Sequence, residues 1–207
     1  MKKFELTAET KMVLGRTLYR IRALVAFGNV NAGELGGWIE KENNLSQSGD
    51  AWVSGNALVS GNAEVFGNAR VFGNAEVSGN AWVSCNVEVS GNARVFGNAR
   101  VFGNAWVSGN AEVFGDARVF GNAEVFGNAR VFGNAAIMTI SHIGSRFGTT
   151  TFFALKNKKI GVRCGCFYGD IDEFAAKVEA THGDNQHGKA YRIAIELAKL
   201  QIKTSEE

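Results

Sequence analysis

The sequence predicts a mainly β protein, a triangular parallel β-helix followed by a small C-terminal module, and three observations support this prediction. One hexapeptide, A-x-V-x-G-N, repeats without a gap from Ala51 to Asn134, which gives fourteen copies. The chain contains 26 glycines but no proline, a composition that excludes collagen-like and polyproline structures. Finally, the charged residues of the repeat alternate in sign at a spacing that suits a coil of three strands.

A strand followed by a turn fits the hexapeptide better than a helix does. At about 100° per residue, a period of six carries the valine around a helix axis, and each glycine in a helix costs about 1 kcal/mol relative to alanine. In an extended A-x-V segment, Ala and Val face one side and the middle residue faces the other. Gly and Asn take positive φ most readily, so we expect the Gly-Asn pair to form the corner.

The charges at the second repeat position favour three strands per coil over two. Residues one coil apart stack at about 4.8 Å, so like charges repel there. At a spacing of 18 residues Arg70 stacks on Glu88, and Arg100 on Arg118 is the one like pair. A further column alternates in sign throughout: Glu76, Arg94, Glu112 and Arg130. At a spacing of 12, like pairs outnumber opposite pairs, so we predict an 18-residue coil.

The repeat V-[SF]-G-N-A-x is similar to the hexapeptide pattern of left-handed β-helix proteins. The resemblance covers the fourteen repeats and implies a left-handed coil, although Ser or Phe stands here where the pattern often has Gly. Acyltransferases with this fold need a general base, usually His. The repeats contain no His, Lys, Tyr or Thr, so we expect no such activity and no enzyme in the solenoid.

Three segments follow from the repeat: an N-terminal β cap at 1–44, the β-helix at 45–140 and a C-terminal ββαα module at 141–207. We expect degenerate repeats, Leu45–Asp50 and Ala135–Ile140, to end the helix. The segment Leu18–Asp50, especially NAGELGGWIEKENNLSQSGDAWV, resembles the N-terminal part of hexapeptide-repeat proteins of phages and prophages, which are labelled polymer-forming or of unknown function.

The C-terminal module is predicted from local patterns. Thr149–Leu155 and Lys159–Cys164 read as a hairpin, and Asp170 is a good N-cap for a helix that Gly183 ends. A second helix is predicted from about Lys189 to Ile202. The motifs IGSR, GCFYG and His182-Gly183 resemble a C-terminal module of phage-encoded proteins, to which no firm activity is attached.

Phenylalanine at the outward fourth position predicts self-association. Three stacked rings expose an apolar patch of the size that marks interfaces, although the rings could also be a ladder that only covers the corner. We therefore expect a homo-oligomer, a dimer or trimer joined through its sides. The candidate interface residues are Phe96, Phe102, Phe114, Phe120, Phe126 and Phe132.

The leading functional hypothesis is a non-enzymatic scaffold, without cofactor, that self-associates and presents its C-terminal module to a partner such as a host protein. An alternative is a phage anti-defence protein that sequesters a nucleotide signal of host immunity, with cationic side chains on the phosphates. Another is a cysteine- and histidine-dependent enzyme. The candidate ligand-binding residues are Ser145, Arg146, Lys158, Lys159, Arg163, Cys166 and His182.

We expect neither a metal site nor a catalytic site among these residues. Cys164 and Cys166, with His182 and His187, are possible zinc ligands, but a one-residue gap between cysteines is shorter than zinc sites usually show. A Cys166–His182 nucleophile pair would also need an orienting group and an oxyanion hole, which the sequence does not supply.

Charge and cysteine content indicate the compartment. The net charge of +2 is too small to suggest nucleic-acid binding, and no apolar run approaches the 18 residues of a membrane span. Charged residues interrupt any signal-peptide core near the N-terminus, and three cysteines are typical of a reducing environment. We expect a cytoplasmic location in a bacterial host cell.

Overall fold

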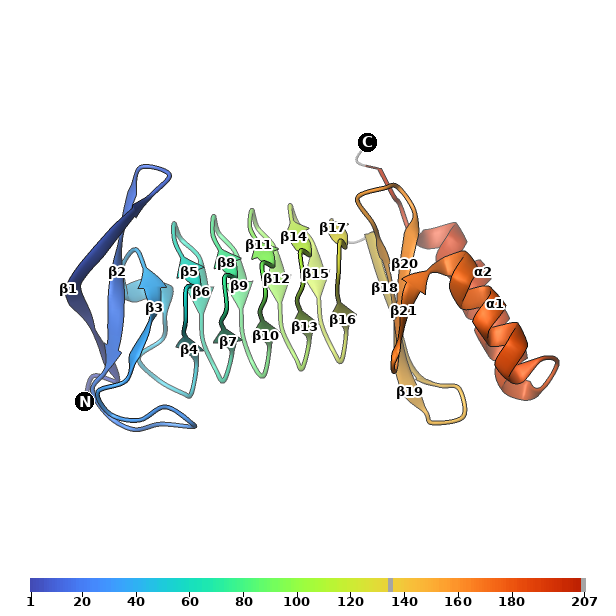
Figure 1. Ribbon diagram of the computed structural model, residues 1–207, viewed down its shortest axis with the longest axis horizontal. Helices are drawn as coiled ribbons and strands as arrows, with labels where there is room; N and C mark the ends of the chain where they lie inside the picture. Colours follow the sequence, from blue (N-terminus) through green and yellow to red (C-terminus); the bar gives the residue numbers. More distant parts are fainter. Residues whose placement is uncertain (134–135, 206–207) are drawn as a thin grey trace.

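The structure is a computed structural model that describes residues 1–133 and 136–205. An N-terminal cap, a β-solenoid and a C-terminal module follow one another along the long axis (Figure 1). The mainly β fold with a parallel solenoid of 18-residue coils is confirmed, because Val53 pairs in parallel with Val71. Asn134 of the last predicted repeat and Ala135 of the degenerate one lie outside the described residues.

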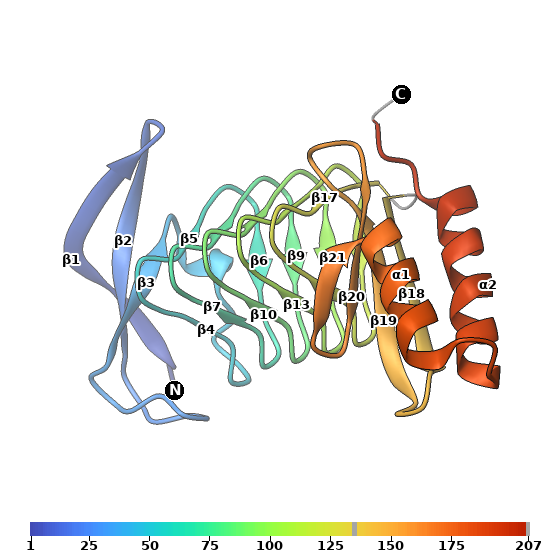
Figure 2. The same ribbon diagram turned by 45° about the vertical axis from the view of Figure 1, so that its right-hand side comes forward.

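The solenoid has three faces, each a parallel sheet of very short strands (Figure 2). The first face contains β4 (Trp52–Val53), β7 (Arg70–Val71), β10 (Glu88–Val89), β13 (Trp106–Val107) and β16 (Glu124–Val125). The second contains β5 (Leu58–Val59), β8 (Glu76–Val77), β11 (Arg94–Val95), β14 (Glu112–Phe114) and β17 (Arg130–Phe132). The third contains β6 (Glu64–Val65), β9 (Trp82–Val83), β12 (Arg100–Val101) and β15 (Arg118–Val119).

The first- and third-position side chains fill the interior, as the period of two predicts. Val65, Val77 and Val89 are completely buried, and the first-position residues, alanine in every copy except Val87, are at most 1% exposed. Small β-branched and methyl side chains from three faces therefore pack a narrow core. The second and fourth positions, which carry the charges and aromatic rings, point outward.

The two corner residues have different roles. Gly takes the positive φ, for example 67° at Gly91, where an added Cβ would lie 3.0 Å from the backbone nitrogen of Gly109 in the next coil. The expectation of positive φ for Asn is wrong, because no described repeat asparagine has it. Instead, the amides form a ladder along each corner, such as Asn86 Nδ2 donating to Asn104 Oδ1 at 3.0 Å.

The N-terminal cap extends the second face. The order in that sheet is β1 (Phe4–Val13), β2 (Arg16–Ala23), β3 (Leu35–Ile39) and then β5. Trp38 of β3 pairs with Leu58, twenty positions later, and after the 3-10 turn Glu42–Asn44 a bridge joins Leu45 to Val65 at the same offset. Leu45 is therefore in register with the repeat valines, and the leading coil is two residues longer than the others.

The C-terminal module contains both predicted helices and a larger sheet than predicted. The hairpin is present as β19 (Gly148–Ala154) and β20 (Ile160–Cys164), but β18 (Ile137–Ile143) and β21 (Phe167–Asp170) flank it in an antiparallel sheet. Residues Ile137–Ile140 belong to β18 and not to a last degenerate repeat. Their backbone groups pair with β19, which supplies an antiparallel partner where the coil has ended.

The helices cover the side of this sheet that faces away from the solenoid (Figure 1). Helix α1 (Ile171–His182) begins after Asp170, whose carboxylate accepts hydrogen bonds from the backbone of Asp172 and Glu173, and Gly183 follows its last turn. Helix α2 (Gln186–Gln201) begins three residues before the predicted start, because Asn185 caps it. None of the described helices is both long and apolar enough to cross a membrane.

Candidate functional site

The interior and the corners of the solenoid offer no chemistry to a ligand. Val and Ala side chains fill the core, and the corner amides bond one another along the ladders. Any binding site on the solenoid must therefore use the outward side chains of its three faces.

On the second face, the charged side chains neutralise one another. The predicted column is present: Glu76 Oε2 lies 3.3 Å from Arg94 Nε, and Arg130 Nε lies 3.9 Å from Glu112 Oε2. Arg94 also approaches Glu112 at 4.0 Å. Because these charges are paired within the chain, the net electrostatic potential of this face is small and attracts a charged ligand only weakly.

The predicted aromatic column on this face is also present. The rings of Phe96 and Phe114 are parallel with centroids 4.9 Å apart, and Phe132 follows at 6.1 Å with a tilt. All three rings are half-buried. Arg94 and Arg130 lie over the rings of Phe96 and Phe114, at 5.3 Å and 5.0 Å from the centroids, and cover part of them.

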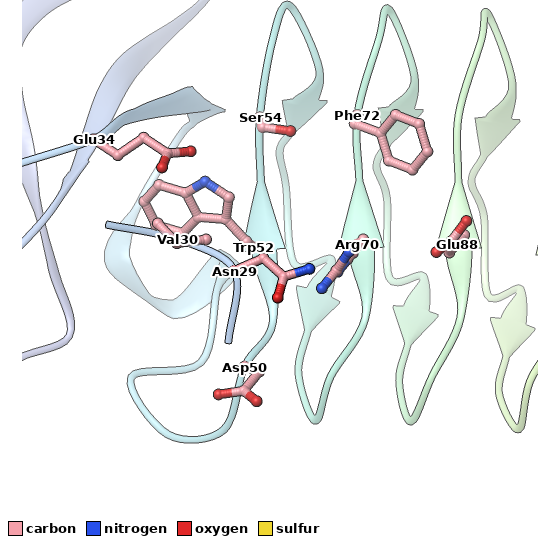
Figure 3. A pocket seen from close by; sticks show the side chains of 9 residues that line it. All are labelled: Asn29, Val30, Glu34, Asp50, Trp52, Ser54, Arg70, Phe72 and Glu88. Carbon is pink, nitrogen blue, oxygen red and sulfur yellow. The ribbon is translucent and has the colours of Figure 1, made fainter. Parts of the chain in front are cut away.

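The first face has a cavity of about 280 Å³ where the 29–34 loop lies over the first coils (Figure 3). Asp50, Arg70 and Glu88 line it, and their side chains form no hydrogen bond or ion pair with another described residue. Trp52 forms part of the wall, and its buried Nε1 has no hydrogen-bond partner. Glu34 adds a third carboxylate beside the single arginine, so the lining disfavours a phosphate ligand.

The third face combines unpaired charge with exposed aromatic rings. Arg100 stacks on Arg118 in the parallel register, and no ion pair joins either arginine to a carboxylate within residues 1–133 and 136–205. Arg100 lies over the Trp82 ring, 5.2 Å from its centroid. A shallow cavity of about 440 Å³ runs along these three side chains and the neighbouring corner residues Asn98 and Asp116.

Three of the four exposed aromatic rings in the described repeats lie on this face, and the fourth, Trp106, lies on the first face. Trp82 is 44% exposed, Phe102 is 37% exposed and Phe120 is 57% exposed. Phe102 and Phe120 stack at 5.5 Å, as predicted from the 18-residue coil. Because it joins this apolar surface to an arginine pair that forms no ion pair with a described residue, the third face is the best candidate for an interaction surface.

The candidate ligand residues of the C-terminal module do not form one cluster. Ser145 and Arg146 lie in the β18–β19 turn, whereas Lys158 lies in the β19–β20 turn at the opposite end of the sheet. Lys159 is held by Asp170, whose hydrogen bond at 2.6 Å raises the pKa of the lysine. Arg163 bonds Glu124 of the solenoid at 2.7 Å. These cations therefore do not converge on a common phosphate position.

Of the two remaining candidates, His182 packs on a buried tyrosine and Cys166 does not contact it. Thr150 Oγ1 donates to Cys164 Sγ at 3.1 Å, and Cys164 Sγ lies 3.5 Å from the Tyr191 hydroxyl. Burial, and then the hydrogen bond with Cys164, raise the pKa of Tyr191, so its phenol stays protonated. The His182 ring packs on the tyrosine at 5.7 Å. Cys166 is exposed in the β20–β21 turn.

The possible zinc ligands are likewise not assembled. Among the described residues, no three His, Cys, Asp or Glu side chains lie close enough together to hold a metal ion. His182 and His187 contact each other with ring centroids 5.9 Å apart, and Cys164 is engaged with Thr150 and Tyr191.

In the sequence, the Arg100–Arg118 pair stands out only as an exception to the charge pattern, and Trp82 was not connected with it. The 18-residue register places all three side chains in one column. The break in an otherwise alternating pattern was therefore the signal for this face.

Comparison with known proteins supports the fold. A family model described as the YdcK beta solenoid repeat matches residues 93–109, which is about one coil. No curated protein matches the chain. The matched segment and the parallel coils around it make this chain a β-helix repeat protein.

Proposed function

We propose that the protein is a non-enzymatic scaffold of phage type that self-associates through the sides of its solenoid and presents its C-terminal module to a partner in the bacterial cytoplasm. The observation that carries the proposal is the exposure of Trp82, Phe102 and Phe120 on one face of the solenoid. Large apolar side chains gathered in this way favour association with another surface.

The covered ends of the solenoid support association through the sides. At the start, β3 pairs with β5 and occupies the edge of the second face. At the end, the C-terminal sheet docks on the last coil, where Glu124 N donates to Thr151 Oγ1 and Ala129 forms a bridge with Leu155. Lys156 adds an ion pair with Glu112 at 3.1 Å. Stacking of further strands on these covered edges is disfavoured.

Helix α2 supports the role of the C-terminal module in binding. Its inner side, with Ala194, Ile195 and Ala198, is buried. Ile193 and Leu200 are largely exposed on the outside, and Leu197 between them is partly exposed. Their i, i+4, i+7 spacing forms one apolar stripe, the pattern with which amphipathic helices dock into grooves.

Analytical ultracentrifugation tests self-association directly. We expect the wild-type sedimentation coefficient to rise with concentration toward that of a dimer. A wild type that stays monomeric at several hundred micromolar would overturn the proposal. A Phe102→Ser/Phe120→Ser variant should associate more weakly, because it removes two exposed rings from the third face. We expect its fold to be kept, because the repeat already uses Ser at this position.

The matched control is Phe96→Ser/Phe114→Ser on the second face. It removes two stacked rings at the same repeat position, but these rings are half-buried and partly covered by arginines. We expect this variant to lose some stability and to associate like the wild type. Equal weakening by both pairs would show that association is not specific to the third face.

A further inference from the structure

The order of outward side chains on the third face is self-complementary when it is reversed. Along the second-position column, β6, β9, β12 and β15 carry Glu64, Trp82, Arg100 and Arg118. Read in the opposite direction, the column places an arginine opposite the glutamate and an arginine opposite the tryptophan. This arrangement would compensate the Arg100–Arg118 stack, the one like-charged neighbour pair among the described strand pairs of the repeats.

We propose that the third face binds the third face of a second copy, with the two solenoids antiparallel about a two-fold axis that runs along the strands between β9 and β12. This inference rests on the proposed self-association and names its surface and geometry. In this contact Glu64 faces Arg118 of the second copy. Trp82 faces Arg100 of the second copy, which then lies between two indole rings and gains a second cation–π contact. Each contact occurs twice, as a two-fold interface requires.

The fourth-position column fits the same axis. Rotation about a line parallel to the strands keeps each column opposite itself, so Phe66 faces Phe120 of the second copy. Ser84 then lies opposite Phe102 of the second copy and leaves space for its ring. Phe66 already contacts Trp82 edge-on at 5.9 Å, so the rings of the two columns form one continuous apolar surface.

The size of the face sets the expected strength of the dimer. Four strands at about 4.8 Å and six residues at about 3.3 Å cover roughly 19 by 20 Å. This is smaller than the roughly 800 Å² per partner of a standard interface. The solenoid face alone therefore predicts a reversible dimer with a dissociation constant on the order of micromolar, rather than a permanent one.

The antiparallel arrangement has a functional consequence. It places the two C-terminal modules at opposite ends of the paired rods, so the dimer presents two copies of the α2 stripe that point apart. One dimer can then bridge two partner molecules, whereas a parallel pair would offer both stripes side by side to one partner surface.

Charge reversal tests this geometry. In a homodimer, Arg118→Glu places glutamate opposite Glu64, and Glu64→Arg places arginine opposite Arg118. We expect each variant alone to dimerise at least about tenfold more weakly in sedimentation experiments. Within one chain both changes are tolerable, because a glutamate at position 118 would stack on Arg100 and an arginine at position 64 would lie beside Trp82. Lys177→Glu on the exposed side of α1 makes the same change in net charge as Arg118→Glu and should have no effect on dimerisation.

The decisive experiment mixes the two variants. In an antiparallel heterodimer of Glu64→Arg and Arg118→Glu chains, both contacts between positions 64 and 118 again join an arginine to a glutamate, so we expect the mixture to dimerise with near-wild-type affinity. A wild-type dimer that neither variant weakens, or a mixture that stays monomeric, would overturn this geometry and leave self-association intact. A different result would assign the arginine pair to an anionic ligand instead. In that case the wild type would be monomeric, and pyrophosphate or ATP would stabilise it in a thermal-shift assay but would not stabilise Arg100→Ala/Arg118→Ala.

Discussion

Cys85 is the one described residue other than glycine at the fifth repeat position. Its φ of 64° lies in the left-handed region, which costs an L-residue with a Cβ roughly 1–2 kcal/mol. Cys85→Gly removes this strain from the folded state. Glycine also raises the conformational entropy of the unfolded chain, which offsets part of the gain in stability. We expect the free energy of unfolding to rise by about 0.5–1 kcal/mol, measured by urea denaturation. Cys85→Ala removes the thiol but keeps the Cβ, and a similar gain there would show that backbone strain is not the cause.

Lys3 makes the stability of the N-terminal cap depend on pH. Its ammonium group is buried, donates to the Ala51 carbonyl at 2.9 Å and has a pKa lowered from 10.5 to about 8, mainly by burial. Because the folded pKa is the lower one, the unfolded chain binds more protons between these values, and stability rises with pH there. Relative to Lys3→Gln, the wild type should gain stability from pH 8 to 10.5 and show a constant difference below pH 7. Chemical denaturation across this range would contradict the prediction if the difference did not change.

At the scale of the elements, the asparagine ladders stabilise the stacking of coils. Asn104 accepts from Asn86 and donates to Asn122 at 3.1 Å, whereas the Asn122 side chain at the end of this ladder has Asn104 as its one hydrogen-bond partner among the described residues. At about 0.5–1.5 kcal/mol for each hydrogen bond, Asn104→Ala should destabilise the protein by roughly twice as much as Asn122→Ala. Thermal unfolding of the two variants compares them directly. Equal losses would mean that the ladder bonds contribute nothing beyond the turn itself.

The elements also show which parts of the fold a sequence can predict. The coil could be predicted because its six-residue period and inward Val and Ala are local patterns, and because its charge alternation shows which residues stack 18 positions apart. The strands β18 and β21 were not predicted, because each is defined by its antiparallel partner and not by a local pattern. In addition, Ile137–Ile140 resembles a degenerate repeat in sequence. The third face required the register first, since only stacking brings Trp82 into one column with Arg100 and Arg118.

For the whole molecule, the C-terminal module acts as the stop of the solenoid. A chain that ends at Gly133 loses the contacts of Thr151 and Leu155 with the last coil and exposes the edges of β16 and β17. We expect this truncated chain to associate end to end into filaments or aggregates, visible by electron microscopy and dynamic light scattering. The full-length protein at the same concentration is the control. A truncated chain that stays monomeric would show that the last coil needs no cover.

Because each coil has three faces of six residues, the number of repeats determines both the distance between the two ends and the orientation of the C-terminal module about the solenoid axis. Adding one whole coil of 18 residues moves the C-terminal module about 4.8 Å farther from the N-terminal cap and leaves its orientation unchanged. Adding a single hexapeptide advances the chain by one face, so the module turns by a third of a revolution. Duplication of repeats therefore gives selection two separate controls, one over the distance between the ends and one over the direction in which the outer helix points.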